Sequence, residues 1–133
     1  MKRILFFCLI LLAAQTFAQN KQNADFVKYI NNYKAIAIKQ MREYRIPASI
    51  ILAQGLLESG AGNSELARRS NNHFGIKCGT SWKGKTVKHD DDRRNECFRV
   101  YKSVEDSYKD HSVFLQKPRY QSLFKLDPLD YKS

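Results

Sequence analysis

The sequence lacks several features that would assign it to large classes of protein. It has no internal repeat and no low-complexity tract, so a repeat architecture is excluded. Its longest apolar run, residues 4–14, is shorter than the roughly 20 residues that a membrane-spanning helix needs. It also lacks an arginine-rich tail and the motifs typical of nucleic-acid-binding domains. We therefore expect no nucleic acid among its partners.

The N-terminus has the three parts of a secretory signal peptide. Basic residues precede the apolar run, and small residues follow it up to Ala18, as at a cleavage site. Residues 1–18 are predicted to be removed, which leaves no integral membrane segment. Cys8 lies inside the apolar run rather than after it, which argues against a lipoprotein. We expect residues 19–24 to be a polar linker and residues 25–133 to form one domain, in the periplasm or outside the cell.

Acidic residues are the minority among the charged ones. There are 13 Asp and Glu against 23 Lys and Arg, which gives a net charge of +10. Such a surplus favours an anionic partner. For an exported protein, an anionic cell surface or cell-wall polymer is the partner that we favour. The other explanation is that the charge only keeps the protein soluble.

Cysteine is scarce, with three residues in the chain, one of which leaves with the signal peptide. Cys78 and Cys97 remain, and two cysteines in an oxidising compartment predict a disulfide. In the chain-entropy treatment, a loop of this size is stabilised by about 3 kcal/mol. The alternative is a zinc site that includes His73 and His89, although their spacing matches no standard ligand pattern.

Hydrophobic periodicity and turn residues divide the rest of the chain into short elements. Apolar residues at helical spacing predict helices, and alternation around a polar turn predicts a β-hairpin. Pro47 suits a first helical turn, and Ser64 and Ser103 occupy N-cap positions. The expected elements are helices over 25–44, 47–58 and 65–69, a hairpin of 81–88 and 96–101 around the turn 90–95, a helix over 103–117 and a short helix over 120–126. The disulfide is expected to pin the hairpin across its base.

One stretch, residues 45–67, places a single carboxylate at the end of a buried helix. Residues 50–57 are apolar on more than one face, as expected of a core helix, and Gly60 suits a left-handed C-cap. Glu58 then lies in the last turn, where the helix dipole and apolar neighbours disfavour its ionised form. Such a group suits a general acid near neutral pH, with Gln54 one turn back on the same face. The alternative is an exposed helix-end carboxylate without a catalytic role.

Three further features have both a structural and a functional interpretation. The loop 70–77 either closes turns on its own backbone through paired asparagines, or presents amide groups and one aromatic ring to a sugar. Trp82, the only tryptophan, either stacks on a sugar ring or caps the apolar face of the hairpin. His111 lies on the apolar face of its helix, where we expect a core histidine rather than a catalytic one.

Several separated motifs occur in one order over about residues 40–126. They are Ala53-Gln-Gly-Leu-Leu-Glu-Ser-Gly60, Ser64-Glu-Leu-Ala67, Asn71-Asn-His-Phe-Gly-Ile-Lys77, Cys97-Phe-Arg-Val-Tyr-Lys-Ser103 and Ser107-Tyr-Lys-Asp-His-Ser-Val-Phe-Leu115. In this order and with these gaps, they resemble the bacterial glucosaminidase family. These proteins are the endo-β-N-acetylglucosaminidases of peptidoglycan, of the flagellar-muramidase-like type.

The resemblance implies an α+β, mainly α, lysozyme-like helical domain with a small β-hairpin lobe across a groove. It implies hydrolysis of the β-1,4 bond between N-acetylglucosamine and N-acetylmuramic acid in peptidoglycan glycan strands, with no metal or organic cofactor. Glu58 matches the family's catalytic acid. The second carboxylate of the family lies on the β-lobe, where Asp90, Asp91 and Asp92 are the candidates unless all three are turn residues. The candidates for sugar contact are Gln54, Asn72, Phe74, Lys77, Trp82 and Tyr101.

The sequence leaves the route of hydrolysis open. A hairpin aspartate can activate water or act as nucleophile, or the N-acetyl carbonyl of the substrate can replace it. Family members generally continue into a further segment with aromatic residues, whereas this chain stops at Ser133, so a C-terminally truncated copy is one expectation. The alternatives to an enzyme are a non-catalytic module that binds cell-wall glycan and a cationic secreted protein that acts through charge alone.

Overall fold

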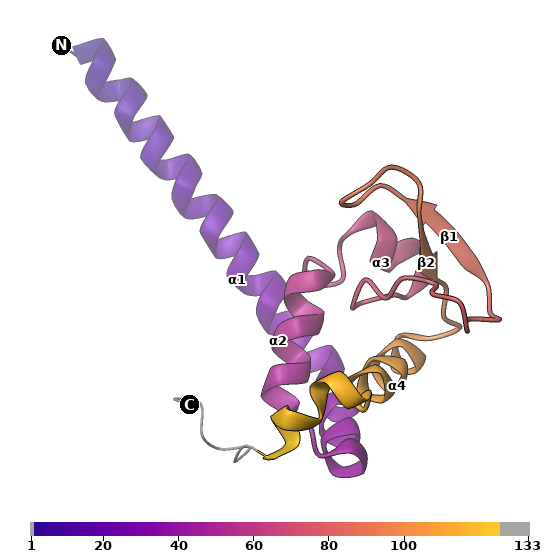
Figure 1. Cartoon of the computed structure of the whole chain (residues 1–133). Coiled ribbons are helices and arrows are strands. Elements are labelled where there is room, and N and C mark those ends of the chain that lie inside the picture. The colour runs from indigo at the N-terminus through magenta and orange to yellow at the C-terminus, as the bar shows by residue number, and fades with distance from the viewer. Residues whose placement is uncertain (1, 126–133) are drawn as a thin grey trace.

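The computed structural model describes the backbone of residues 2–125 and, apart from residues 20 and 123, the side chains of residues 19–125. The elements are α1 (Lys2–Tyr44), α2 (Ala48–Glu58), α3 (Glu65–Ser70), β1 (Thr86–His89), β2 (Glu96–Arg99), α4 (Val104–Leu115) and the 3-10 helix η1 (Pro118–Lys125) (Figure 1). The predicted mainly helical fold with one small antiparallel hairpin is confirmed. The expected end of the last helix, at residue 126, lies outside the described residues.

The first helix differs from its prediction at one end. α1 runs without a break through residues 19–24, where the sequence predicted a linker, and it does not start at Asp25 (Figure 1). Residues 19–24 contain neither glycine nor proline, so nothing local interrupts the helix. The predicted end at Tyr44 is confirmed. The helix stops there because Arg45 adopts a left-handed φ of 60° and a proline follows two residues later. Cleavage after Ala18 stays a prediction.

Within the described part of the chain, no helix has the length and apolar character needed to cross a membrane.

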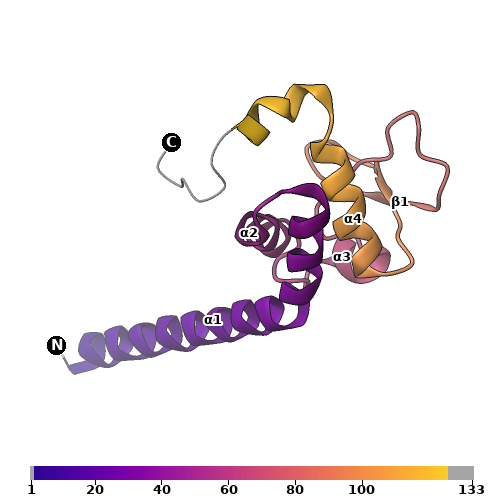
Figure 2. The ribbon, with the colours of Figure 1, turned by 90° about the horizontal axis from the view of Figure 1, so that it is seen from below.

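Helices α1, α2 and α4 pack around one core with the loop that follows α3 (Figure 2). Tyr29 of α1 and Tyr108 of α4 are completely buried, and their hydroxyl oxygens are 2.8 Å apart in a hydrogen bond. Both rings lie against Gly55 in the middle of α2. A Cβ atom at that position would lie 2.6 Å from the Tyr29 hydroxyl and 3.1 Å from that of Tyr108. The absence of a side chain at Gly55 therefore sets how closely the three helices approach. The buried core cluster comprises Ala37, Ile46, Ile51, Phe74, Ile76 and Tyr108.

The β-lobe is a hairpin with one extra segment beside it. β1 and β2 pair antiparallel, with Thr86 opposite Arg99, and are shorter than the sequence predicted. The predicted disulfide between Cys78 and Cys97 is confirmed. It does not pin the hairpin across its base, however, because Cys78 lies in the segment before the hairpin. That segment pairs with the other edge of β2, where Lys77 is opposite Phe98. The disulfide therefore joins β2 to the loop after α3.

Two predicted helix caps are present. The Ser64 hydroxyl accepts a hydrogen bond from the Ala67 backbone N–H at 3.2 Å, at the start of α3. Ser103 and Asp106 form the reciprocal capping box that opens α4. Each cap satisfies backbone donors that a helix start would otherwise leave unpaired.

We expect Gly55→Ala to lower the free energy of unfolding, measured by urea denaturation. Overpacking costs typically about 1–3 kcal/mol, and the upper part of this range applies because the added Cβ would lie 2.6 Å from the Tyr29 hydroxyl. This cost exceeds the gain of about 1 kcal/mol in helix propensity. The control is Ala53→Gly at an exposed position of the same helix, which should cost about 1 kcal/mol through propensity alone. Unchanged or increased stability of Gly55→Ala would show that this close approach is not limiting.

Candidate active site

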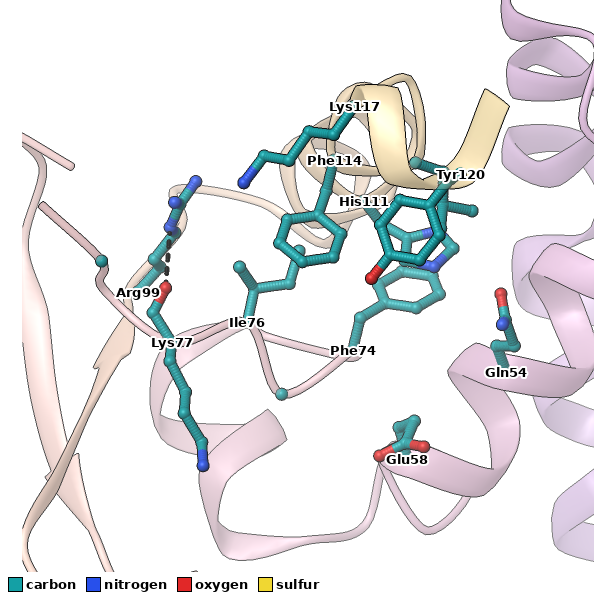
Figure 3. A pocket seen from close by; sticks show the side chains of 13 residues that line it. Gln54, Glu58, Phe74, Ile76, Lys77, Arg99, His111, Phe114, Lys117 and Tyr120 are labelled. Atoms are coloured by element: carbon teal, nitrogen blue, oxygen red, sulfur yellow. Dashed lines mark hydrogen bonds between the residues drawn. The ribbon is translucent and has the colours of Figure 1, made fainter. Parts of the chain in front are cut away.

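A cavity of about 550 Å³ lies between the end of α2, the loop after α3 and the start of η1 (Figure 3). Its size is in the range of pockets that bind small ligands. The lining residues come from four separate parts of the chain. They are Gln54, Glu58, Phe74, Gly75, Ile76, Lys77, Gly79, Arg99, His111, Phe114, Leu115, Lys117 and Tyr120.

Glu58 is held on a rigid helix end. As predicted, Gly60 follows the helix with a left-handed φ of 56°. Its N–H donates to the Leu57 carbonyl at 3.3 Å, and the next N–H donates to the Leu56 carbonyl at 2.7 Å, which is the Schellman arrangement. Ser59 is fully buried, and its hydroxyl donates to the Gly55 carbonyl and accepts from the Gly62 N–H. The turn is therefore fixed while the Glu58 side chain stays exposed at the cavity.

Four of the predicted site residues meet at this cavity. Glu58 and Gln54 come from α2, and Phe74 and Lys77 come from the loop after α3. Figure 3 shows the two α2 side chains on one side and the Phe74 ring on the other. The cavity thus combines a carboxylate, an amide and an aromatic surface, which are the groups that a sugar-binding site needs.

Three other predicted sugar contacts support the fold instead. Asn72 is 1% exposed, and its amide bonds to the Ile76 N–H and to the carbonyls of Ile76 and Arg99. The buried Tyr101 donates its hydroxyl to Asp110 at 2.6 Å. The Trp82 indole N–H donates to a backbone carbonyl three residues on. None of the three residues lines the cavity. For Asn72, the structure fits the interpretation in which paired asparagines close turns on the backbone, and not the one in which they contact a sugar.

The hairpin aspartates lie beside the cavity without lining it. The Asp90 carboxylate accepts a hydrogen bond from the Asn95 N–H at 2.8 Å and so closes the turn. The Lys77 ammonium, which does line the cavity, lies 3.5 Å from Asp91 and 3.6 Å from Asp92. It also pairs with Glu96 at 2.9 Å. Glu96 was not among the residues predicted for the site, because it lies in a strand, outside the acidic run 90–92.

Sequence reasoning also missed most of the far wall of the cavity. Arg99 joins the β-lobe to α4, because its guanidinium pairs with Asp110 at 2.8 Å and donates to the carbonyls of Lys77 and Cys78. The expected core histidine, His111, is buried, yet it also lines the cavity and stacks on Phe74 with ring centroids 3.9 Å apart. The remaining aromatic and basic groups of this wall, Phe114, Lys117 and Tyr120, lie at or after the end of α4.

A network of buried hydrogen bonds connects α1, α4 and the loop after α3. The Tyr29 hydroxyl bonds to His73 Nδ1 at 2.9 Å as well as to the Tyr108 hydroxyl. Burial raises the pKa of Tyr29 to about 12, against smaller opposing effects of hydrogen bonds with Tyr108 and Ser59. Burial also lowers the pKa of His73 to about 4, so the ring is neutral at neutral pH. The alternative of a zinc site is disfavoured, because the two sulfur atoms bond to each other and His73 bonds to tyrosine.

Known proteins match this chain in sequence and in fold. The family described as mannosyl-glycoprotein endo-beta-N-acetylglucosaminidase matches residues 34–133. Peptidoglycan hydrolase FlgJ of Vibrio parahaemolyticus is 33% identical over 106 residues, which cover 71% of this chain and 34% of FlgJ. The chain spans about a third of the length of the first curated relatives that it matches.

Two solved structures are similar as well. The crystal structure of a peptidoglycan hydrolase from Sphingomonas sp. A1 aligns with a TM-score of 0.64 and 32% identity, covering 70% of this chain and 64% of that one. The glycoside hydrolase domain of Salmonella typhimurium FlgJ aligns with a TM-score of 0.64 and 29% identity, covering 76% and 67%.

The helical body, the hairpin lobe and the cavity between them define the lysozyme-like class of glycoside hydrolase domains. Because the family matches most of the chain, this protein belongs to the glucosaminidase family.

The two buried histidines predict a loss of stability in acid. Burial lowers the pKa of both His73 and His111 to about 4, with Asp110 opposing the shift at His111. The unfolded chain titrates near 6.5, so it binds these protons first as the pH falls. The free energy of unfolding should therefore be highest above pH 6.5 and fall between about pH 6.5 and 4, by about 3 kcal/mol per histidine.

Urea denaturation across this pH range measures the effect. His73→Gln should remove about half of the histidine contribution to the slope, whatever its effect on stability at pH 7. His89→Gln, in the hairpin and outside the network, should keep the full slope. An unchanged slope in His73→Gln would contradict the assignment.

Proposed function

We propose that this protein is an exported peptidoglycan hydrolase that cleaves the β-1,4 bond between N-acetylglucosamine and N-acetylmuramic acid. The observation that carries the proposal is the position of Glu58. Among the described residues it is the single carboxylate that lines the cavity, and it stands on a fixed helix end. Membership of the glucosaminidase family supports the same chemistry.

In this proposal Glu58 acts as the general acid. It donates a proton to the leaving glycosidic oxygen while the sugar ring gains oxocarbenium character. Phe74 is mostly buried and stacks on His111, but the part of its ring that lines the cavity gives a sugar an apolar contact. Gln54 offers both a donor and an acceptor for hydroxyl or acetamido groups. The rigid turn after Glu58 keeps the carboxyl in place, which avoids reorganisation during the reaction.

The second catalytic group is best sought at Asp91. Asp90 is engaged in its own turn, and the Asp92 side chain is 86% exposed. The Asp91 side chain is half-buried and contacts Lys77, whose ammonium borders the cavity. The acetamido carbonyl of the substrate is the alternative nucleophile, because it needs no second carboxylate.

A second candidate function is a module that binds wall glycan without cleaving it. The observation that favours it is that no hairpin carboxylate lines the cavity within the described part of the chain. Cleavage and binding must therefore be measured separately.

Export follows from the N-terminal leader, with removal of residues 1–18 as proposed from the sequence. The Cys78–Cys97 bridge supports it, since disulfides persist in oxidising compartments. The positive net charge would hold the protein near anionic wall material, with an affinity that weakens as salt increases.

The decisive experiment is digestion of purified peptidoglycan by the parent protein and by Glu58→Gln. Loss of a general acid lowers rates by typically about 10²–10⁴-fold, so the variant should release almost no product and still pellet with the wall. Borohydride reduction and mass spectrometry identify the new reducing ends. N-acetylglucosamine ends made only by the parent would support the proposal, and N-acetylmuramic acid ends would mean that the other bond is cut.

The matched control is Glu65→Gln, which removes a carboxylate that pairs with Arg69 on α3, outside the cavity. This variant should keep the parent rate. Wall binding without cleavage by the parent protein would favour the binding module.

Asp91→Asn should lower kcat by about 10²-fold or more if Asp91 activates water or attacks the sugar. Asp92→Asn, its charge-matched neighbour, should leave kcat near the parent value. Both variants lose one contact with Lys77, so the loss of that ion pair is common to the two. Equal and nearly full activity in both would contradict the role of Asp91 and favour the acetamido route.

A further inference from the structure

Four cationic side chains lie on or beside the wall of the cavity, and they differ in how their charge is balanced. Lys77 has three carboxylates within 4 Å, those of Asp91, Asp92 and Glu96. Arg99 pairs with the half-buried Asp110 at 2.8 Å. The charges of these two groups are thus compensated inside the protein, and both also fix the position of the β-lobe.

The other two cations, Lys117 and Arg119, have no carboxylate within 4 Å among the described side chains of residues 19–125. They contact aromatic rings instead. The Lys117 ammonium lies 4.2 Å from the centroid of the Phe114 ring. The Arg119 guanidinium lies 5.1 Å from the same centroid and 4.7 Å from that of Tyr120. Both side chains are exposed, and we refer to Lys117 and Arg119 together as the cationic rim.

The cationic rim is placed to meet a ligand that occupies the cavity. Lys117 lines the cavity itself, and Arg119 packs on two rings that line it. Figure 3 shows Lys117 on the opposite side of the cavity from Glu58. The aromatic faces hold the two cations in defined positions, which lowers the entropy lost when an anion binds. A sugar positioned at Glu58 would therefore extend its substituents toward two exposed cations that pair with no carboxylate in the part of the chain whose side chains the structure describes.

We propose that the cationic rim binds a carboxylate of the peptide stem on the muramic acid, and so selects glycan strands that carry anionic stems. This inference rests on the proposed function, because it assumes a peptidoglycan strand in the cavity. A neutral strand of N-acetylglucosamine has no group for the rim to bind. Carboxylate is also the anion that both Lys and Arg bind well by charge-assisted hydrogen bonds.

Two parts of the strand can supply a carboxylate. One is the stem peptide, and the other is the lactyl group of muramic acid once an amidase has removed the stem. Three substrates separate these sources. They are intact strands, strands stripped by an amidase, and intact strands whose carboxylates have been converted to amides with carbodiimide and ammonia.

The test compares the parent with Lys117→Met/Arg119→Met, which keeps apolar length against the two rings and removes both charges. On intact strands, kcat/KM should fall about fivefold to tenfold through KM, since hydrogen bonds to charged groups are worth that much or more. On amidated strands, parent and variant should be equal. Equal values on intact strands would overturn the inference. If a loss then appeared only on stripped strands, the ligand of the rim would be the lactyl carboxylate instead of the stem.

The control for total charge is Lys102→Met/Lys109→Met, which removes two exposed cations that do not line the cavity. It should behave like the parent on all three substrates. Lys117→Arg/Arg119→Lys keeps both charges and should restore most of the affinity. A loss of the same size in the control would show that only net charge matters, and the inference would fail.

Binding in the Glu58→Gln background separates this inference from the proposed function. Sedimentation with intact and with amidated wall material gives the ratio of the two affinities without any need for cleavage. A preference for intact material that disappears in Lys117→Met/Arg119→Met supports the cationic rim even if the parent cuts nothing. If the Glu58→Gln protein showed no preference for intact over amidated material, the inference about the cationic rim would be overturned, whatever the activity of the parent.

Discussion

The arrangement of this domain depends on the close approach that Gly55 permits in the middle of α2. The hydroxyls of Tyr29 and Tyr108 and the tip of Phe74 all lie where a side chain would otherwise stand. One turn later the same helix ends at Glu58. At Gly55, α2 packs tightly against α1, α4 and the loop after α3. The Glu58 carboxylate therefore lies at the edge of the core, where it lines the cavity. A larger side chain at this point would push α2, and Glu58 with it, away from the Phe74 side of the cavity.

The charged groups around the cavity divide into those that build it and those left for a ligand. Arg99 and Lys77 are paired with carboxylates and hold the β-lobe against α4 and the loop after α3. Their charge is balanced, so their contribution is mainly geometric. Lys117 and Arg119 lie on aromatic rings of the cavity wall, and Lys117 is on the opposite side of the cavity from Glu58 (Figure 3). In the function that we propose, this separation lets one end of the cavity carry out proton transfer while the other recognises an anionic substituent.

Local patterns were predicted well where a short stretch contains its own physical cause. Gly60 was expected to cap α2 because a left-handed residue follows many helices, and the capping box at Ser103 depends on residues three positions apart. Predictions failed where the deciding contact comes from elsewhere. Asn72 was expected to face a sugar, but its amide is used up by the carbonyls of Ile76 and Arg99, and Arg99 lies 27 residues away in sequence.

The sequence by itself determined the helical body, the hairpin, the cysteine pair and the identity of the candidate acid, since each follows from residues close together or from an ordered set of motifs. Only the tertiary structure decided what surrounds that acid. It placed His111 in the cavity wall as well as in the core, turned Tyr101 and Asn72 into supports, and set Lys77 among the hairpin carboxylates. The physical reason is that burial and charge balance depend on which side chains meet, and spacing along the chain does not fix this.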